Sequence, residues 1–524
     1  MRISMKDRER CREVLFLGLV CLGVLLAILW LAVFRPLAWD EVEFLRATRW
    51  VSRGRIPYRD FWEHHTPLQW FIFAPLDRLG GGPGASAVLW LRWCQVPLWG
   101  VALAAWYQWM KRTCGPVWLV LLAMALLLCS PFFTLFALEY RIDTLASVLL
   151  LLGLTLLLTE GRAWRAPLAG VFLGAVPMAN LRLGPTVGLI LVAACFMDLR
   201  ERRWGLNRDG LWCAFWGAAV WGLGALGLLA THTWGPFWTQ VWADNAAFAA
   251  STPASSRAFW TILGQAVSQW DLAVPLFLVL AQVALPPLIR DLRRPSGQHL
   301  VAGAFLANLV LVYQLNIHYF YHFQALLLLA LPLAVLSFSN WVSVGDRVRR
   351  AQIIAGGACV LVLALLLNQA FGMASVRQDR QLAYQDEIMR EVESRTRPDE
   401  SVWDGCGFAL DREPAYERWF LPLLVRTSVR AGRMKALSPD AFLAHPPAAV
   451  VFNKRLYSWC AESRDLAAVL IQNYLPLRPH LWIPAPNGLL GPGLRERNWR
   501  ILRSGHYRLA ASPKLAEHPW FRWP

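Results

Sequence analysis

Long runs of apolar residues, separated by short polar segments, fill residues 1–372. A helix needs roughly 20 apolar residues to cross a bilayer core, and the shorter runs here predict thin or tilted spans. The pattern therefore predicts a polytopic α-helical membrane domain with about 11 transmembrane helices, at residues 14–34, 85–110, 117–137, 144–159, 168–179, 183–197, 211–230, 272–289, 300–315, 323–338 and 353–371.

Two longer polar segments, 35–84 and 231–270, are predicted to be external loops. The first contains an apolar stretch at 67–79 that is too short to span, so it predicts a juxtamembrane helix rich in aromatic residues. The second is rich in Trp and Ala and predicts amphipathic helices at the membrane interface.

Residues 373–524 have a mixed polar and apolar composition. A helical pattern covers 377–396, and strand-like runs occur at SVWD (401–404), AAVVFN (448–453) and WRILRSGHYRLA (499–510). A length of roughly 150 residues is typical of one small soluble domain. We therefore predict a small extracytoplasmic α/β domain at the C-terminus.

Basic residues alternate between the ends of the apolar runs in the way that the positive-inside rule predicts for cytoplasmic segments. The N-terminal segment is basic, and the run at 14–34 lacks a small-residue cleavage site, so it predicts a retained first helix with a cytoplasmic N-terminus. An odd number of spans then places the C-terminal domain outside. We expect a multi-pass protein of the bacterial inner membrane, with this domain in the periplasm.

The composition agrees with a membrane protein, since 56% of the residues are hydrophobic and 29 are tryptophan. The net charge of +17 comes from short basic runs between apolar segments, which predict topology signals and phosphate ligands rather than a nucleic-acid partner. Eight of the ten cysteines lie in or beside apolar runs without CxxC spacing. Whether Cys406 and Cys460, in the predicted external domain, form a disulfide stays open.

Five polar motifs share one external face in this topology: WDE, WEHH, EYRID, NLRLG and NIHYFYH. Ionisable residues at membrane depth are costly and usually mark a functional site. External arginines also oppose the positive-inside trend, and a guanidinium binds a lipid phosphate through paired hydrogen bonds. The candidate substrate- and phosphate-binding residues are Tyr58, His64, His65, Arg141, Asp143, Arg182 and His318.

A carboxylate beside a site for a lipid phosphate predicts glycosyl transfer from a polyprenyl-phosphate sugar. Asp40 is the predicted general base, which takes the proton of the acceptor hydroxyl while arginine stabilises charge on the departing phosphate. The phosphate link already activates the sugar. This agrees with a sequence that contains no nucleotide-binding glycine fingerprint.

Asp40 and Glu41 just after the first helix, followed by GRIPYRDFWEHHTPL and later by YRIDT, resemble the GT-C superfamily of membrane glycosyltransferases. Within it, residues 10 to about 340 resemble the protein O-mannosyltransferases and lipid A aminoarabinose transferases. The resemblance implies that Asp40 is the catalytic base, Glu41 a supporting acid, and Arg141 or Arg182 the phosphate ligand. Departures are Arg182, where many relatives have lysine, and His-Thr-Pro at 65–67, where aminoarabinose transferases have Lys-Pro.

Each candidate also has a purely structural interpretation. Asp40 and Glu41 are typical of a helix N-terminus, Arg141 and Asp143 of a local ion pair, and the aromatic and histidine residues of a membrane interface. Neighbouring histidines are poor joint ligands for one metal on a helix, although a carboxylate can complete a site with one of them. No cofactor is firmly indicated, and a divalent metal stays open.

The alternative function is a transporter or flippase for a lipid-linked precursor, because a basic external cavity also suits that role. Transporters more often show internal repeats and polar breaks at the bilayer midplane, whereas the polar motifs here gather at one face. A non-catalytic scaffold is a third option. The expected partners are a polyprenyl-phosphate sugar, membrane lipid, and a lipid, glycan or protein acceptor, and the sequence leaves the sugar and the acceptor open.

Overall fold

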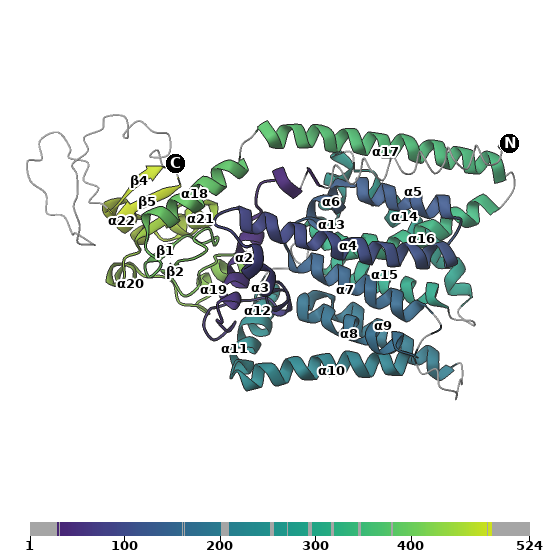
Figure 1. Cartoon of the computed structure of the whole chain (residues 1–524), viewed down its shortest axis with the longest axis horizontal. Helices are drawn as coiled ribbons and strands as arrows, with labels where there is room; N and C mark the ends of the chain where they lie inside the picture. Colours follow the sequence, from purple (N-terminus) through teal and green to yellow (C-terminus); the bar gives the residue numbers. More distant parts are fainter. Residues whose placement is uncertain are drawn as a thin grey trace, which may run out of the picture.

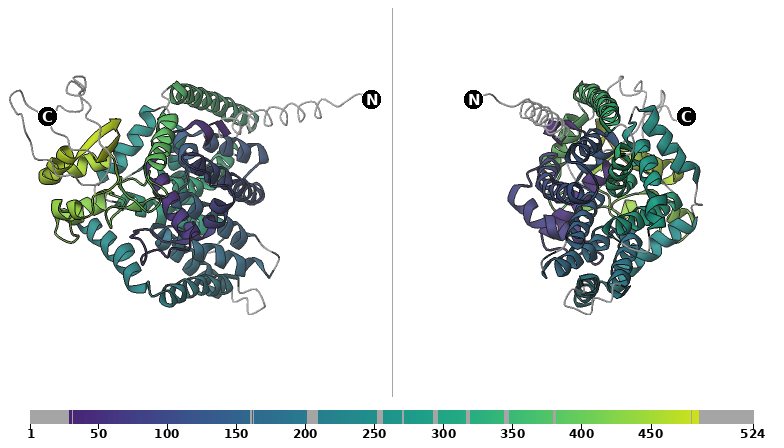
Figure 2. Two further views of the ribbon diagram at one scale, coloured as in Figure 1. Left: turned by 60° about the vertical axis from the view of Figure 1, so that its left-hand side comes forward. Right: turned by 90° about the vertical axis from the view of Figure 1, so that its right-hand side faces the viewer.

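The computed structural model describes residues 29–484 except 31, 160, 162, 201–208, 252–255, 270, 292–295, 316–318, 344–346, 379–380 and 479. A bundle of helices forms the larger part, and a smaller C-terminal domain lies at one end of it (Figure 1). The turned views show the same arrangement (Figure 2). Most of the first predicted span, and the strand-like run at 499–510, lie outside the described residues.

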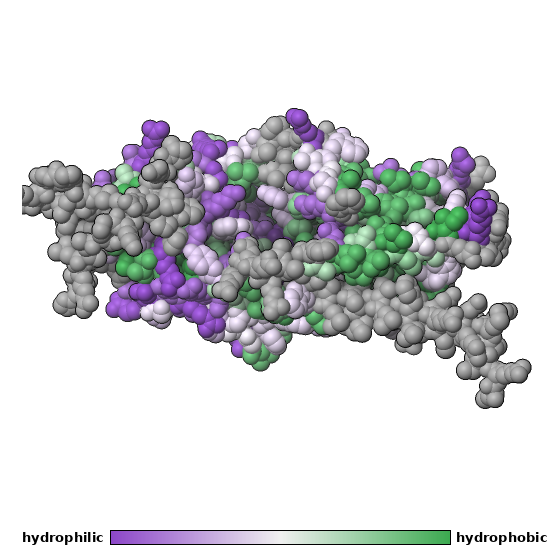
Figure 3. All heavy atoms as spheres, turned by 90° about the horizontal axis from the view of Figure 1, so that it is seen from above, coloured by the Kyte–Doolittle hydropathy of each residue, from purple (hydrophilic) through white to green (hydrophobic). Residues whose placement is uncertain are grey.

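The bundle helices share one large apolar core. On the face that Figure 3 shows, hydrophobic residues gather over the bundle, and hydrophilic residues gather at its far end and over the C-terminal domain. Large exposed apolar areas are typical of contact with lipid or with another protein. The bundle elements are α4 (Ser86–Thr113), α5 (Val117–Cys129), α6 (Pro131–Ala137), α7 (Ile142–Leu158), α8 (Arg165–Ala179), η1 (Leu181–Leu183), α9 (Gly184–Arg200), α10 (Asp209–Ala230), α14 (Ala273–Arg290), α15 (Gly297–Gln314), η3 (Phe320–His322), α16 (Phe323–Ser343) and α17 (Arg347–Gln378).

Four helices in the described part of the chain are long and apolar enough to cross a membrane: α4, α10, α14, and α16 together with η3. The bent pair α5 and α6 is a fifth candidate, while α7, α8, η1 with α9, and part of α17 are apolar but shorter. A mostly helical membrane protein is therefore confirmed. The count of about 11 spans is not confirmed and stays a prediction.

The span predicted at 117–137 is broken by a bend of 70° between α5 and α6. Pro131 follows the break, and its ring nitrogen cannot donate the hydrogen bond that would continue α5. Asp271, which is buried, stabilises the new helix start: its Oδ2 accepts hydrogen bonds from Ser130 Oγ at 2.7 Å and from the backbone N–H of Phe132 at 2.9 Å.

Helices α8 and α10 approach closely because glycines line their contact. A Cβ at Gly170 would lie 2.2 Å from the carbonyl oxygen of Cys213, and one at Gly174 would lie 2.6 Å from that of Gly217. Small residues spaced by four are typical of close helix pairs in membranes. Because α8 also packs against α7, the short turn η1 after α8 is held near the start of α7.

Helices of both predicted external loops lie where the bundle meets the C-terminal domain (Figure 1), whereas the last helix of the second loop, Ser256–Ser268, packs against α14 and α15 of the bundle. The helix predicted at 67–79 is confirmed as α3. A short π-helical turn, η2, joins two of the helices in the second loop. The elements of these two segments are α2 (Trp39–Ser52), α3 (Leu68–Gly80), α11 (Trp234–Phe237), η2 (Trp238–Ala243), α12 (Asp244–Ser251) and α13 (Ser256–Ser268).

The C-terminal domain has a sheet of five strands in the order β2-β1-β3-β5-β4. β1 pairs in parallel with β2 and β3, and β5 pairs antiparallel with β3 and β4. The strand-like runs at 401–404 and 448–453 contain β1 and β3. The elements are α18 (Gln381–Arg395), β1 (Ser401–Trp403), β2 (Glu413–Pro414), α19 (Leu423–Arg430), α20 (Pro439–Ala444), β3 (Ala449–Val451), α21 (Lys454–Glu462), α22 (Arg464–Asn473), β4 (Tyr474–Arg478) and β5 (Leu481–Pro484).

Cys406 and Cys460 are both buried in this domain and are free thiols. No disulfide therefore joins them, and apolar packing rather than a covalent link holds this part of the domain together.

Arginines of α2 hold the C-terminal domain against the bundle. Arg46 is buried, pairs with Asp404 at 3.4 Å, and donates from Nη2 to the carbonyl oxygen of Arg412 at 2.8 Å. Its guanidinium lies over the rings of Trp50 and Trp419, at 4.7 and 5.1 Å from the ring centroids. A cation–π contact of this kind is worth more in the interior than at the surface, which helps to offset the burial of the Arg46 charge. The two parts of the molecule thus meet through α2.

Candidate active site

Asp40 lies in the first turn of α2, where the helix dipole favours a carboxylate. Its two oxygens accept hydrogen bonds from arginines of two different parts of the molecule. Oδ2 lies 2.9 Å from Nη1 of Arg141, at the start of α7. Oδ1 lies 3.0 Å from Nη2 of Arg455, in α21 of the C-terminal domain. The Asp40 side chain is 27% exposed, so it is paired and still accessible.

The protonation of Asp40 depends on these two arginines. Burial by itself would raise the pKa of the Asp40 carboxyl, but the charges and hydrogen bonds of Arg141 and Arg455 outweigh it and lower the pKa below its ordinary value. Asp40 is therefore an ionised carboxylate at neutral pH.

Arg141 connects Asp40 to two further acidic residues. Its Nη1 lies 3.2 Å from Oε2 of Glu139, and its Nε lies 3.6 Å from Oδ2 of Asp143. Arg182, in η1, pairs with the other oxygen of Asp143. The guanidinium carbons of Arg141 and Arg182 lie 3.8 and 6.0 Å from the ring centroid of Tyr321. The structure therefore brings three sequence candidates, Arg141, Asp143 and Arg182, into one chain of ion pairs with Asp40.

Glu41, the neighbour of Asp40, is fully buried and points to a different partner. Arg92 of α4 donates to it from Nε at 2.7 Å and from Nη2 at 2.5 Å. The backbone N–H groups of Tyr140 and Ala38 also donate to it, each at 2.9 Å. Both oxygens are thus occupied, so this geometry favours a role in fixing α2 on the bundle over direct contact with substrate.

Tyr58 is also buried, and its hydroxyl donates to the carbonyl oxygen of His65 at 2.6 Å. Its φ of 69° lies in the left-handed region, which a residue with a bulky side chain rarely adopts. The ring packs edge-on against Phe237, so Tyr58 shapes the segment that carries the histidines.

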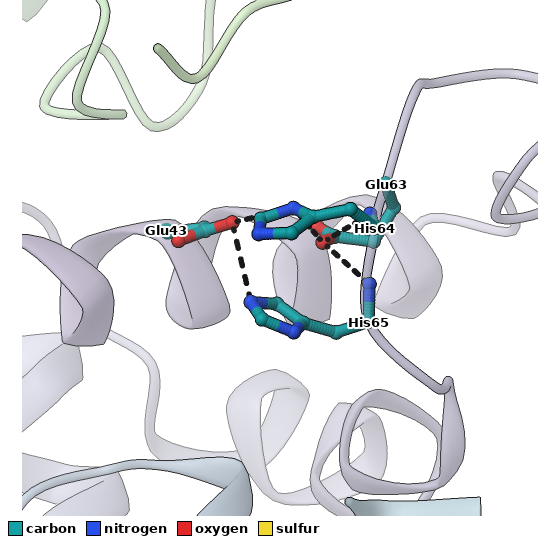
Figure 4. Close-up of side chains that lie close together, drawn as sticks. All are labelled: Glu43, Glu63, His64 and His65. Carbon is teal, nitrogen blue, oxygen red and sulfur yellow. Dashed lines mark hydrogen bonds and ion pairs between the residues drawn. The ribbon is translucent and has the colours of Figure 1, made fainter. Parts of the chain in front are cut away.

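His64 and His65 meet two glutamates beside α2 (Figure 4). His64 Nδ1 lies 3.7 Å from Oε1 of Glu43 and 3.4 Å from Oε1 of Glu63, and His65 Nε2 lies 3.9 Å from Oε1 of Glu43. One nitrogen or oxygen atom from each of these four side chains lies within 4.8 Å of all the others. We call Glu43, Glu63, His64 and His65 the His–Glu cluster.

The His–Glu cluster contains buried polar atoms that need a partner. Oε1 of Glu43, Oε2 of Glu63 and Nδ1 of His64 are buried without a hydrogen-bond partner among the described residues. Burial and nearby acidic groups raise the pKa of Glu43 well above its ordinary value. Burial and nearby positive charges lower the pKa of His65 well below its ordinary value, so its imidazole is neutral. Two carboxylates and two imidazoles are a donor set that suits Zn²⁺.

The second external loop supports this cluster. Asn245 of α12 donates from Nδ2 to the carbonyl oxygen of His64 at 3.0 Å. Gln240 of η2 accepts from the backbone N–H of Glu63 at 2.9 Å and donates to the carbonyl oxygen of Tyr58 at 3.2 Å. The segment between Tyr58 and His64 is thus held between α2 and the second loop.

Glu43 and Arg455 belong to this site but were not predicted from the sequence. Glu43 stands three residues after Asp40, a spacing that puts both on one face of a helix, so the pattern contained a signal for it. Arg455 had no such signal because it is 415 residues away from Asp40 along the chain. His318, a predicted substrate contact, lies outside the described residues.

No protein-family model matches the sequence, and a search of curated proteins finds no match. Solved structures do match in fold. ArnT from Cupriavidus metallidurans in the apo state aligns with a TM-score of 0.58 and 14% identity, over 91% of this chain and 99% of that one. The same protein bound to undecaprenyl phosphate aligns with a TM-score of 0.55 and 13% identity, over 90% and 98% of the two chains.

The archaeal oligosaccharyltransferase of Archaeoglobus fulgidus, in complex with Zn and sulfate, aligns with a TM-score of 0.52 and 14% identity, over 89% of this chain and 73% of that one. ArnT is a lipid A aminoarabinose transferase, and both neighbours are members of the GT-C superfamily. This chain therefore shares the fold of these two membrane proteins, which agrees with the fold that the sequence motifs implied.

The buried ion pair of Glu41 and Arg92 should contribute to the stability of the fold. Glu41→Gln should leave the Arg92 guanidinium buried without a counter-charge, and we expect a loss of about 3–5 kcal/mol. Thermal unfolding of the purified protein in detergent measures this as a lower Tm. Glu417→Gln is the matched control, because that carboxylate is 76% exposed and its loss should leave the Tm unchanged. Equal Tm values for both variants would contradict the structural role of Glu41.

Proposed function

We propose that this chain is an integral-membrane glycosyltransferase, which moves a sugar from a polyprenyl-phosphate-linked donor to a hydroxyl group of a lipid, glycan or protein. The observation that carries the proposal is Asp40, an accessible carboxylate between two arginines at the end of the bundle that meets the C-terminal domain. The fold supports it, because neighbours with this fold are seen with undecaprenyl phosphate and with dolichol-phosphate.

In the proposed reaction Asp40 accepts the proton of the acceptor hydroxyl as that oxygen attacks the anomeric carbon. The bond between the anomeric carbon and the phosphate oxygen breaks, and its electron pair stays on the departing phosphate. That phosphate gains a negative charge in the transition state, so arginines aimed at it stabilise the transition state more than the ground state. The ion pairs of Arg141 and Arg182 with Asp143 support this role, because they join both guanidinium groups to one carboxylate and Arg141 also contacts Asp40.

We also propose that the His–Glu cluster holds a divalent metal such as Zn²⁺. Three buried atoms of the cluster lack a hydrogen-bond partner among the residues described, and a cation would satisfy them. Zinc ligands bound tetrahedrally lie about 3.3–3.5 Å apart. Three contacts in the cluster measure 3.4–3.9 Å and all four ligand atoms lie within 4.8 Å of one another, so small side-chain shifts would bring them around one ion. A bound metal would supply positive charge that offsets the two glutamates and would fix the histidine segment on α2.

The side of the membrane on which this site works is a further part of the proposal. The positive-inside distribution of basic residues supports an external site, with the C-terminal domain in the periplasm of a bacterium.

Asp40→Asn should abolish transfer while the protein stays folded, because the amide keeps the shape of the side chain but cannot accept the proton. General-base loss commonly lowers the rate about a hundredfold to ten-thousandfold. The measurement is turnover of a polyprenyl-phosphate sugar by purified protein, followed by mass spectrometry. Asp399→Asn, at a side chain that is 74% exposed, is the control and should keep full activity. Wild-type turnover by Asp40→Asn would rule out Asp40 as the base, and a flippase would show no turnover in any variant.

Metal content tests the His–Glu cluster without an activity assay. Protein purified without chelator should contain about one Zn²⁺ ion per chain by elemental mass spectrometry. Glu43→Gln with His64→Ala should lose it, whereas His445→Ala, at an exposed histidine, should retain it. A chelator should lower the Tm of the wild type and leave that of the double variant unchanged. A wild-type protein that stays metal-free after incubation with Zn²⁺ would refute the site.

The proposed orientation predicts the behaviour of reporter fusions. A reporter that is active only outside the cytoplasm should be active when fused after residue 372 and inactive when fused near residue 205. The opposite pattern would place Asp40 and the C-terminal domain in the cytoplasm.

A further inference from the structure

Arg455 reaches the candidate active site from a domain to which the sequence assigned no role. It lies in the first turn of α21, and its guanidinium carbon lies 3.9 Å from the ring centroid of Phe420, which fixes the direction of the side chain. One of its two terminal nitrogens, Nη2, donates to Asp40. The other, Nη1, is buried without a hydrogen-bond partner among the described residues, so it is a donor that the present contacts leave unused.

The C-terminal domain, which carries Arg455, contacts α2 and the histidine segment through several ion pairs and hydrogen bonds. Arg46 pairs with Asp404 in the interior, and Arg49 pairs with Asp411 at 3.3 Å. The indole N–H of Trp419 donates to the carbonyl oxygen of Trp62 at 2.8 Å, next to the His–Glu cluster. Because these contacts immobilise the domain, little entropy is lost when Arg455 binds a ligand beside Asp40.

Arg455 has fewer acidic partners than Arg141. Arg141 has three acidic neighbours, Glu139, Asp143 and Asp40, and Arg182 has Asp143. The ion pair that the structure shows for Arg455 in the described chain is the one with Asp40. An anion that bridges Arg141 and Arg455 would therefore take the place that the Asp40 carboxylate now holds between them.

We propose that Arg455 is a ligand of the phosphate of the lipid-linked donor, and that this phosphate displaces Asp40 from Arg141 and Arg455 when the donor binds. The inference rests on the proposed glycosyl transfer and extends it to the C-terminal domain. In the free protein the arginines hold Asp40 as a poorly basic carboxylate. Transfer of their hydrogen bonds to the phosphate leaves Asp40 free to accept a proton, so donor binding and activation of the base are the same event.

The proposal makes Asp40 and the phosphate competitors for the same two arginines. Undecaprenyl phosphate is the probe, and its Kd for purified protein in detergent is the readout. Arg455→Ala should weaken binding about tenfold or more, because a hydrogen bond between charged groups is lost. Asp40→Asn should strengthen binding by about threefold or more, because the amide competes poorly for a guanidinium.

The double variant Asp40→Asn with Arg455→Ala distinguishes two roles of Arg455: binding the donor phosphate, or only balancing the charge of Asp40. If Arg455 binds the phosphate, Arg455→Ala should still raise the Kd for undecaprenyl phosphate about tenfold in the Asp40→Asn background. If Arg455→Ala has no effect in that background, or if Asp40→Asn weakens binding, the proposal is wrong. Arg455→Lys should restore part of the affinity, since lysine keeps the charge without the paired N–H groups.

Arg430→Ala is the matched control, because Arg430 belongs to the same domain and pairs with Glu462 at the other end of α21. The Kd of the Arg430→Ala variant for undecaprenyl phosphate should equal that of the wild type. Inorganic phosphate at the same concentration should not compete, and effective competition would assign the site to free phosphate instead. A wild type that binds no undecaprenyl phosphate overturns the proposed function as well, whereas a loss of binding in Arg141→Ala with none in Arg455→Ala overturns this inference alone.

Discussion

The structure around Asp40 depends on one constraint, which is that charges removed from water must be compensated by neighbouring charges or hydrogen bonds. Glu41 satisfies it with Arg92 and two backbone N–H groups, and so fastens α2 to α4. Arg46 satisfies it with Asp404 and fastens α2 to the C-terminal domain. The helix that carries Asp40 is thus held from both sides by buried ion pairs.

Two places near Asp40 contain buried polar atoms whose charge or hydrogen-bonding capacity is not fully compensated. The His–Glu cluster has buried oxygens and a nitrogen without hydrogen-bond partners in the described chain, and Arg455 has an unused nitrogen. Both places are next to Asp40, since Glu43 follows it by one helical turn and Arg455 contacts it directly. A cation suits the first place and a phosphate suits the second, so the unsatisfied groups lie where the proposed metal and donor would bind.

Much of the fold followed from local patterns in the sequence. The apolar runs predicted the positions of α4, α7, α10, α14 and α16, and the stretch at 67–79 predicted α3. The positions of β1 and β3 were also predictable, because short runs of β-branched and aromatic residues between turns are typical of strands. In the candidate site, Asp40, Arg141, Asp143 and Arg182 were predicted because they belong to polar motifs at the ends of apolar runs, where ionisable residues usually mark a functional site.

The mostly helical membrane fold, the change to a C-terminal part with its own sheet, and the acidic and basic motifs could thus be read from the sequence, because hydrophobic periodicity and charge act over short stretches of chain. The different partners of Asp40 and Glu41, the pairing of Arg182 with Asp143, and the contact of Arg455 with Asp40 became visible only in the folded chain. These contacts join residues tens to hundreds of positions apart. Helix packing and domain docking create them, and neither leaves a periodic signal in the chain.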